Sequence, residues 1–135
     1  MPITAPDSRL YVVVGVLRNP QGQLLVQQRL PGKPCAGQWE FPGGKVEKNE
    51  SPQQALIREL NEELGVSIKN IIPLTQIAHD YDHANVWLDV YLIDNFEAQV
   101  INLEAQNFAW KTIEEIREMD VLAAVHPILD VVKSL

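Results

Sequence analysis

The stretch FPGGKVEKNESPQQALIRELNEELGV, from Phe41 to Val66, decides how this chain folds. A double glycine near its start is followed by a segment with the signals of a helix beginning. Ser51 suits the N-cap, and Gln54 three residues later completes a capping box. The proline after Ser51 suits the first helical turn, and a glycine after the last leucine suits the helix end. We therefore predict a helix over about 52–64.

Three carboxylates lie close together on this predicted helix. Glu62 lies three residues after Glu59, and Glu63 lies four residues after it. On a helix the three side chains therefore share an arc of about 100°. Arg58 is placed to form an i,i+4 pair with Glu62. The apolar stripe beside them comprises Leu56, Leu60 and Leu64, with Ile57 next to it. Carboxylates at the edge of a buried face need a counter-charge, and Mg²⁺ with substrate phosphates would supply one. A solvated acidic face is the alternative for the triplet taken alone.

The composition is that of a packed, acidic domain. The chain has 135 residues, of which 46% are hydrophobic, and a formal net charge of -7. We predict a single domain over 9–135, preceded by a flexible arm over 1–8. A negative surface repels phosphate backbones, so we expect no nucleic-acid polymer as partner. An anionic small molecule would need a cation to mediate its binding.

Cysteine content and hydropathy indicate the compartment. Cys35 is the single cysteine, so an internal disulfide is impossible, which suits a reducing environment. The beginning of the chain lacks a basic segment followed by a long apolar one, and no run approaches the roughly 18 to 20 apolar residues of a membrane span. We therefore expect a cytoplasmic protein without a membrane partner, and we interpret Cys35 as incidental.

Apolar and β-branched residues recur in several other segments. The run 10–19 is apolar almost throughout, as in a strand buried on both faces, and a turn at 19–22 leads to a second strand at 23–29. We therefore expect a hairpin over 10–29. Further extended segments are predicted at 39–44, 70–82, 84–94 and 108–112, an irregular segment at 95–107, and helices at 112–119 and 126–135. This mixed order indicates an α/β sandwich around a mixed sheet.

The acidic stretch fits a longer pattern, G-x5-E-x7-R-E-U-x-E-E-x-G-U, where U is aliphatic. Gly44 opens it, Glu50 follows, and every later fixed position through Val66 matches. The chain resembles the Nudix hydrolase family on this box. The WEFPGGK segment before the box and the order of strands are similar to the MutT branch. The resemblance implies the Nudix α/β/α sandwich, with a mixed central β-sheet and the Nudix loop-helix.

The resemblance also implies a metal site. Carried over position by position, Gly43 would offer its backbone carbonyl to a divalent ion, and Glu59, Glu62 and Glu63 would bind it through carboxylates. Magnesium is the expected cofactor, and Mn²⁺ could substitute. Glu104 falls where MutT-like enzymes place a further metal-binding glutamate, with Glu97 as the competing choice.

The same carry-over gives the other predicted site residues. Glu59 would bind metal or act as the general base, and Arg58 would hold the carboxylates in place through a charge pair. Glu50 would stabilise the junction of loop and helix. Candidates for substrate binding are Lys45 for phosphate, Phe41 for stacking on a base, and Arg29 for facing the base. An ordinary charge on an edge strand is an equal alternative for Arg29.

The predicted reaction is hydrolysis of a nucleoside triphosphate to the monophosphate and pyrophosphate, by attack of water on the phosphoanhydride. Oxidised or modified nucleotides are among the candidate substrates. The alternatives are another diphosphate linkage, such as a dinucleoside polyphosphate or nucleotide sugar, and a non-catalytic nucleotide-binding module.

Val125 stands where the MutT branch often has a base-reading Asn or Asp, and valine cannot make that hydrogen bond. Specificity for an oxidised guanine nucleotide is therefore in doubt, and His126 or a backbone group is a substitute. Trp39 is expected in the core. Surface positions are favoured for His79, Tyr81 and His83.

Overall fold

The computed structural model describes residues 8–97, 100–101 and 106–135. The predicted flexible arm, apart from Ser8, lies outside this range, and so does Glu104. Of Glu97 only the backbone is described.

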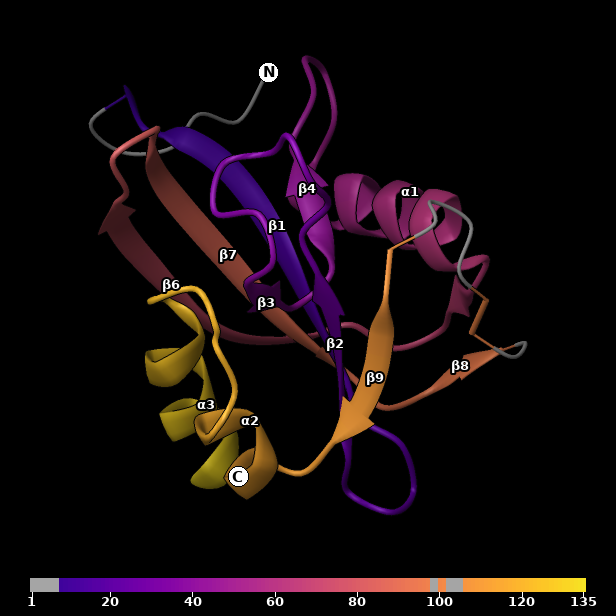
Figure 1. Ribbon diagram of the computed structural model, residues 1–135. Helices are drawn as coiled ribbons and strands as arrows, with labels where there is room; N and C mark the ends of the chain where they lie inside the picture. The colour runs from indigo at the N-terminus through magenta and orange to yellow at the C-terminus, as the bar shows by residue number, and fades with distance from the viewer. Residues whose placement is uncertain (1–7, 98–99, 102–105) are drawn as a thin grey trace.

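A four-stranded mixed sheet forms the centre of the molecule, in the order β4-β1-β7-β6 (Figure 1). Its strands are β1 (Leu10–Leu17), β4 (Gly43–Lys45), β6 (Ile72–Asp80) and β7 (Asn85–Ile93). β1 runs parallel to β7, whereas β4 and β6 pair with their neighbours in antiparallel fashion. The mixed central sheet predicted from the sequence is therefore confirmed.

A second, three-stranded sheet has the order β3-β2-β9, and a two-stranded sheet joins β5 to β8. Their strands are β2 (Leu24–Gln28), β3 (Trp39–Glu40), β5 (Ser67–Ile68), β8 (Phe96–Glu97) and β9 (Phe108–Lys111). Both neighbours of β2 are antiparallel to it. The segment predicted as irregular, 95–107, thus contributes the short strand β8.

The predicted hairpin over 10–29 is wrong in its pairing. The turn forms, with the Gly22 amide donating to the Asn19 carbonyl at 2.9 Å, but a single bridge between Arg18 and Leu24 joins the two strands. β7 pairs along the whole of β1 on one edge, and β4 pairs with Val12–Val14 on the other, while β2 takes β3 and β9 as its partners. The chain therefore turns and enters the second sheet.

Helix α1 (Pro52–Leu64) covers one face of the central sheet (Figure 1). Ser51 and Gln54 form the predicted capping box, and Gly65 ends the helix in the left-handed conformation, with φ 66°. The three leucines of the predicted stripe are buried against Val13, Leu17 and other residues of the sheet. Ile57, expected beside that stripe, is 45% exposed and lies on the solvent side.

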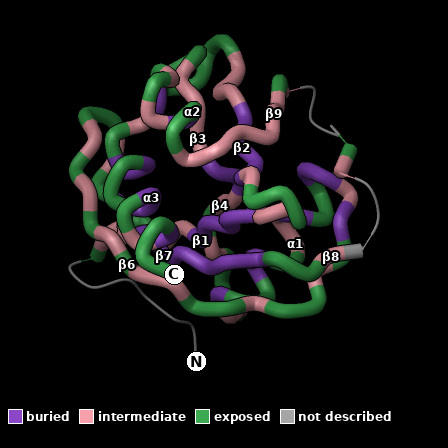
Figure 2. Tube along the Cα trace, turned by 90° about the horizontal axis from the view of Figure 1, so that it is seen from below, coloured by how far each residue is buried: buried purple, intermediate pink, exposed green. Residues whose placement is uncertain are grey.

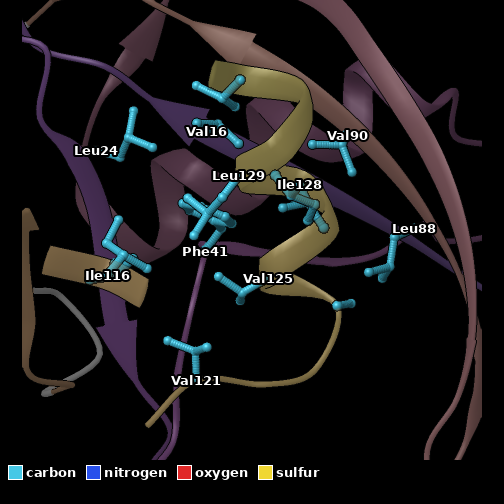
Figure 3. Packing of buried hydrophobic residues seen from close by; sticks show 14 of the residues in the cluster. Val16, Leu24, Phe41, Leu88, Val90, Ile116, Val121, Val125, Ile128 and Leu129 are labelled. Atoms are coloured by element: carbon cyan, nitrogen blue, oxygen red, sulfur yellow. The ribbon is translucent and has the colours of Figure 1, made fainter. Parts of the chain in front are cut away.

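Helices α2 (Ile113–Arg117) and α3 (Val125–Lys133) cover the opposite face. Alternate residues of β1 point to the two layers: Val14 and Val16 pack with α3, whereas Val13 and Leu17 pack with α1. Buried positions therefore follow the central strands (Figure 2), and Figure 3 shows the apolar cluster around α3. The layers form the predicted α/β/α sandwich.

The described helices share one further property: none combines the length and the continuous apolar character needed to cross a bilayer.

The packing of α1 makes a prediction about stability. Leu60 is fully buried against the sheet, so Leu60→Ala should lower the free energy of unfolding by about 2–5 kcal/mol. Ile57→Ala, on the exposed side of the same helix, is the matched control and should change it by about 1 kcal/mol or less. Urea unfolding measures both variants. Equal losses would contradict this orientation of α1.

Candidate active site

The double glycine lets strand β4 pass very close to both β1 and α1. Gly43 and Gly44 pair with Val14 and Val13 of β1. A Cβ atom on Gly43 would collide with the backbone carbonyl of Val13, and a Cβ atom on Gly44 would collide with the carboxylate of Glu59. The two glycines are thus required by close approach, and they bring Glu59 against the backbone of the loop.

Arg58 connects this loop to the acidic face of α1. Its guanidinium donates to both Glu50 oxygens, at 2.7 Å from Nε and 2.9 Å from Nη2. Nη1 donates to Glu59 at 2.9 Å and to Glu62 at 3.4 Å, and Nη2 donates to the Lys45 carbonyl at 3.1 Å. These hydrogen bonds, with Glu50 the largest contribution, raise the pKa of Arg58 above its usual value. The expected pair with Glu62 is present, but the bidentate pair with Glu50 is the shorter one.

Glu50 holds the end of the loop that leads into α1. Besides the two hydrogen bonds from Arg58, it accepts one from the Glu47 amide at 3.0 Å. Hydrogen bonding from Arg58 is the main reason why the pKa of Glu50 lies below its ordinary value. This geometry agrees with the predicted place of Glu50 at the junction of loop and helix.

Glu63 faces the interior beside the second sheet. It is 8% exposed, and its Oε1 accepts a hydrogen bond at 3.4 Å from Nε2 of Gln27 on β2. Gln27 is itself 4% exposed. Gln27 is not among the site residues predicted from the sequence. A signal was available, because Gln27 is a polar residue that continues an apolar strand.

Two cavities lie beside the double glycine. The larger one, of about 520 Å³, extends between the central sheet and the start of α3, and its lining includes Phe41, Lys45 and Val125. The smaller one, of about 170 Å³, is lined by Gln27 and Glu63 among others. Four residues line both cavities: Arg29, Lys33, Glu40 and Gly43. A ligand in the larger pocket could therefore extend past Gly43 toward the acidic helix.

Arg29 lies at the junction of the two cavities and forms a fixed ion pair. Its Nη1 donates to both oxygens of Glu40, at 3.1 Å and 3.2 Å, and its Nε donates to the Pro34 carbonyl at 2.6 Å. Burial is the largest influence on Glu40 and raises its pKa, while the charge of Arg29 acts in the opposite direction. Arg29 therefore lines both cavities while its guanidinium is paired with Glu40, and its role toward a base remains a prediction.

The structure brings further predicted residues to the pocket. Phe41 is 5% exposed, so it belongs to the core as well as to the pocket wall, and Lys45 lies exposed at the rim. Tyr81 and His83 line the pocket, although the sequence favoured surface positions for them. Trp39 packs against the core as expected.

The start of α3 forms another part of the pocket wall. Val125 is 3% exposed and contributes an apolar surface to the lining. His126, considered as its polar substitute, is exposed and does not line the pocket.

The donors around Arg58 fit a hard cation by their chemistry. Glu47, Glu50, Glu59 and Glu62 share the single guanidinium of Arg58, so negative charge is in excess, and all the donors are oxygen atoms. Within the described part of the chain, no three acidic, histidine or cysteine side chains converge closely enough to hold an ion by themselves. Magnesium commonly uses one or two carboxylates and completes its shell with water and substrate phosphate, so these donors suit it.

Comparison with known proteins identifies the family. The model of the Nudix domain matches residues 8–131, and the chain therefore belongs to the Nudix family. The enzyme is a MutT-like Nudix hydrolase, as its relatives indicate. The 8-oxo-dGTP diphosphatase of Escherichia coli K12 is 28% identical over 127 residues, which cover 94% of this chain and 98% of that protein. The CTP pyrophosphohydrolase of the same organism is 31% identical over 127 residues, covering 94% of each protein.

Solved structures have the same fold. A MutT structure from work on Aliivibrio salmonicida and Vibrio cholerae superimposes with a TM-score of 0.80 at 30% identity, covering 94% of this chain and 99% of that one. The Escherichia coli ORF135 protein gives a TM-score of 0.80 at 31% identity, covering 93% and 89%.

The contact between Gly44 and Glu59 can be tested by a double-mutant cycle. Gly44→Ala should lower the free energy of unfolding by about 1–3 kcal/mol, because the added methyl group displaces the Glu59 carboxylate. In a Glu59→Ala background, Gly44→Ala should lower the free energy of unfolding by much less. Chemical denaturation of the four proteins measures the coupling, and equal costs in both backgrounds would contradict the contact.

The pair of Glu50 with Arg58 makes stability depend on pH. The pKa of Glu50 is lowered from its ordinary value of 4.5 in the folded protein, so its stabilising contribution is complete above 4.5 and is lost as pH falls through the lowered value. Wild type should therefore exceed Glu50→Gln in unfolding free energy near neutral pH, and the gap should narrow at acidic pH. Urea titrations at a series of pH values measure it. A gap that stays constant with pH would contradict the ion pair.

Proposed function

We propose that this enzyme hydrolyses a nucleoside triphosphate to the monophosphate and pyrophosphate in a magnesium-dependent reaction. One observation carries the proposal: the apolar pocket, large enough for a base, joins a second cavity at Gly43 beside Glu63 of the acidic helix. A nucleotide with its base in the first pocket would extend its phosphates toward the carboxylates.

Glu59, Glu62 and Glu63, with the Gly43 carbonyl, are the residues that would hold the divalent ion, either Mg²⁺ or Mn²⁺. Glu104 remains a candidate ligand outside the described residues. A bound divalent ion lowers the pKa of water and offsets phosphate charge. Gln27 supports the proposal by fixing one oxygen of Glu63.

The other residues of the site have distinct proposed roles. Arg58 orients Glu59 and Glu62 through its hydrogen bonds. Glu59 either contacts the ion or accepts the proton of the attacking water. Lys45, exposed at the rim of the larger pocket, would contact phosphate. Phe41 would offer its ring to the base.

Arg29 would face the base from the junction of the two cavities. The relatives support nucleotides as the substrate class, because the 8-oxo-dGTP diphosphatase and the CTP pyrophosphohydrolase are both named for action on nucleoside triphosphates. Oxidised and modified nucleotides belong to the substrate panel for the same reason.

Substitution of the carboxylates tests the proposal directly. Glu62→Gln and Glu63→Gln should each reduce magnesium-dependent release of pyrophosphate by at least about 100-fold, because the neutral amide is a poor ligand for a hard cation. Glu114→Gln on α2 is the matched control and should keep the wild-type rate. Circular dichroism establishes that each variant is folded.

Product analysis separates the proposal from its alternatives. A monophosphate together with pyrophosphate is the expected product pair. Turnover confined to dinucleoside polyphosphates or nucleotide sugars would show that the substrate is another compound with a diphosphate linkage. Nucleotide binding without turnover at any divalent metal would indicate a non-catalytic module, and wild-type rates in both glutamine variants would refute the metal assignment.

A further inference from the structure

The wall of the larger pocket is chemically uneven. Most of its lining is aliphatic or aromatic, and the side next to α3 offers no side-chain hydrogen-bonding group at Leu122, Val125 or Ile128. Polar side chains line other parts of the wall, among them Arg29, Glu40, which accepts from Arg29 at 3.1 Å, and Tyr81. We call these three residues the polar cluster. The polar cluster offers hydrogen-bonding groups that the aliphatic side of the pocket lacks. These side chains can recognise a bound base if its hydrogen-bonding edge faces the polar cluster.

Glu40 provides a rigid acceptor within the polar cluster. Strand β3 fixes its backbone, since Glu40 pairs with Gln27 of β2. Arg29 fixes its carboxylate through the two hydrogen bonds at 3.1 Å and 3.2 Å, and the Glu40 side chain is 21% exposed. Each carboxylate oxygen has two lone-pair directions, so the bonds from Arg29 leave acceptor capacity for a ligand.

Tyr81 provides a donor in the same cluster. Its hydroxyl oxygen accepts a hydrogen bond from the Ala124 amide at 3.1 Å, which leaves the hydroxyl proton for a second partner. Burial raises the pKa of Tyr81, so the hydroxyl keeps this proton at neutral pH. The ring is held between His79 and His83, with centroid distances of 4.2 Å and 5.5 Å. The donor is therefore positioned as firmly as the acceptor.

We propose that Glu40 and Tyr81 read the base edge, and that the pocket prefers nucleobases with an exocyclic amino group to those with a carbonyl in its place. The Glu40 carboxylate would accept a hydrogen bond from the amino group, while the Tyr81 hydroxyl donates to the neighbouring ring nitrogen or carbonyl. This inference rests on the proposed function and names its substrate class.

The preference follows from the cost of opposing two acceptors. A base with a carbonyl at that position would set its oxygen against the Glu40 carboxylate in a partly desolvated pocket. A buried polar group without a suitable partner costs far more than the modest gain from a well-made hydrogen bond, so sites of this kind discriminate strongly. The aliphatic wall contributes to affinity for any base but distinguishes poorly between bases of similar shape.

Matched pairs of nucleotides test the inference, since CTP and UTP, ATP and ITP, and GTP and XTP carry an amino group and a carbonyl, respectively, at the same ring position. The wild-type enzyme should favour the amino-bearing member of its preferred pair by at least about tenfold in kcat/KM. Glu40→Gln should reduce this ratio severalfold, because the amide can donate to a carbonyl as well as accept from an amine. Tyr81→Phe should raise KM with little change in kcat. Glu114→Gln is the control and should leave the ratio unchanged.

A binding measurement separates failure of this inference from failure of the proposed reaction. Calorimetric titration of the wild-type protein with CMP and UMP, with AMP and IMP, and with GMP and XMP, in the presence of EDTA, reports base preference without turnover. Tighter binding of the amino-bearing member supports the inference, even if no triphosphate is hydrolysed. Equal affinities within every pair, or an unchanged ratio in a folded Glu40→Gln variant, would overturn it while leaving hydrolysis intact.

Discussion

The close approach of α1 to strand β4 is the constraint on which the rest of the site depends. It exists because Gly43 and Gly44 carry no side chain, so that the loop can lie against β1 on one side and against Glu59 on the other. Arg58 then binds loop and helix together through Glu50 and the Lys45 carbonyl. A helix one residue out of register would place a different side chain against the glycines. The position of the acidic face is therefore set by sterics and by one guanidinium rather than by the carboxylates themselves, which repel one another.

The arrangement of the two sheets converts this acidic face into part of a continuous cavity system. β1 has partners on both edges, so β2 joins β3 and β9 in a second sheet. That sheet carries Gln27 toward Glu63 and places Arg29 and Glu40 where the two cavities meet. The pocket proposed for the base is mainly apolar, whereas the site proposed for phosphate and cation is rich in oxygen atoms, so the two differ in chemistry. They can adjoin here because the glycine loop, which presents mainly backbone, forms the boundary between them.

The box that marks the Nudix family lies on the acidic helix, whereas the polar cluster lies in the wall of the larger pocket. Val125 makes the α3 side of that pocket apolar, and under the inference proposed above discrimination between bases would depend on Glu40 and Tyr81. Relatives that share the fold carry names for different nucleotides, which agrees with a division of labour between a constant phosphate site and a variable pocket. Base preference can then change without disturbing the carboxylates, because the two sets of residues lie on different elements.

The sequence by itself determined the features that depend on residues near one another in the chain. The capping box of Ser51 and Gln54 and the spacing of the glutamates are local, and the structure agrees with the predicted helix to the residue. The tertiary structure alone decided which sheet β2 joins, that Gln27 contacts Glu63, and that Tyr81 lines the pocket. These outcomes depend on competition between strand edges and on packing across the sandwich. Such interactions join residues that are tens of positions apart, so a local pattern can mark Gln27 as unusual in an apolar strand but cannot identify Glu63 as its partner.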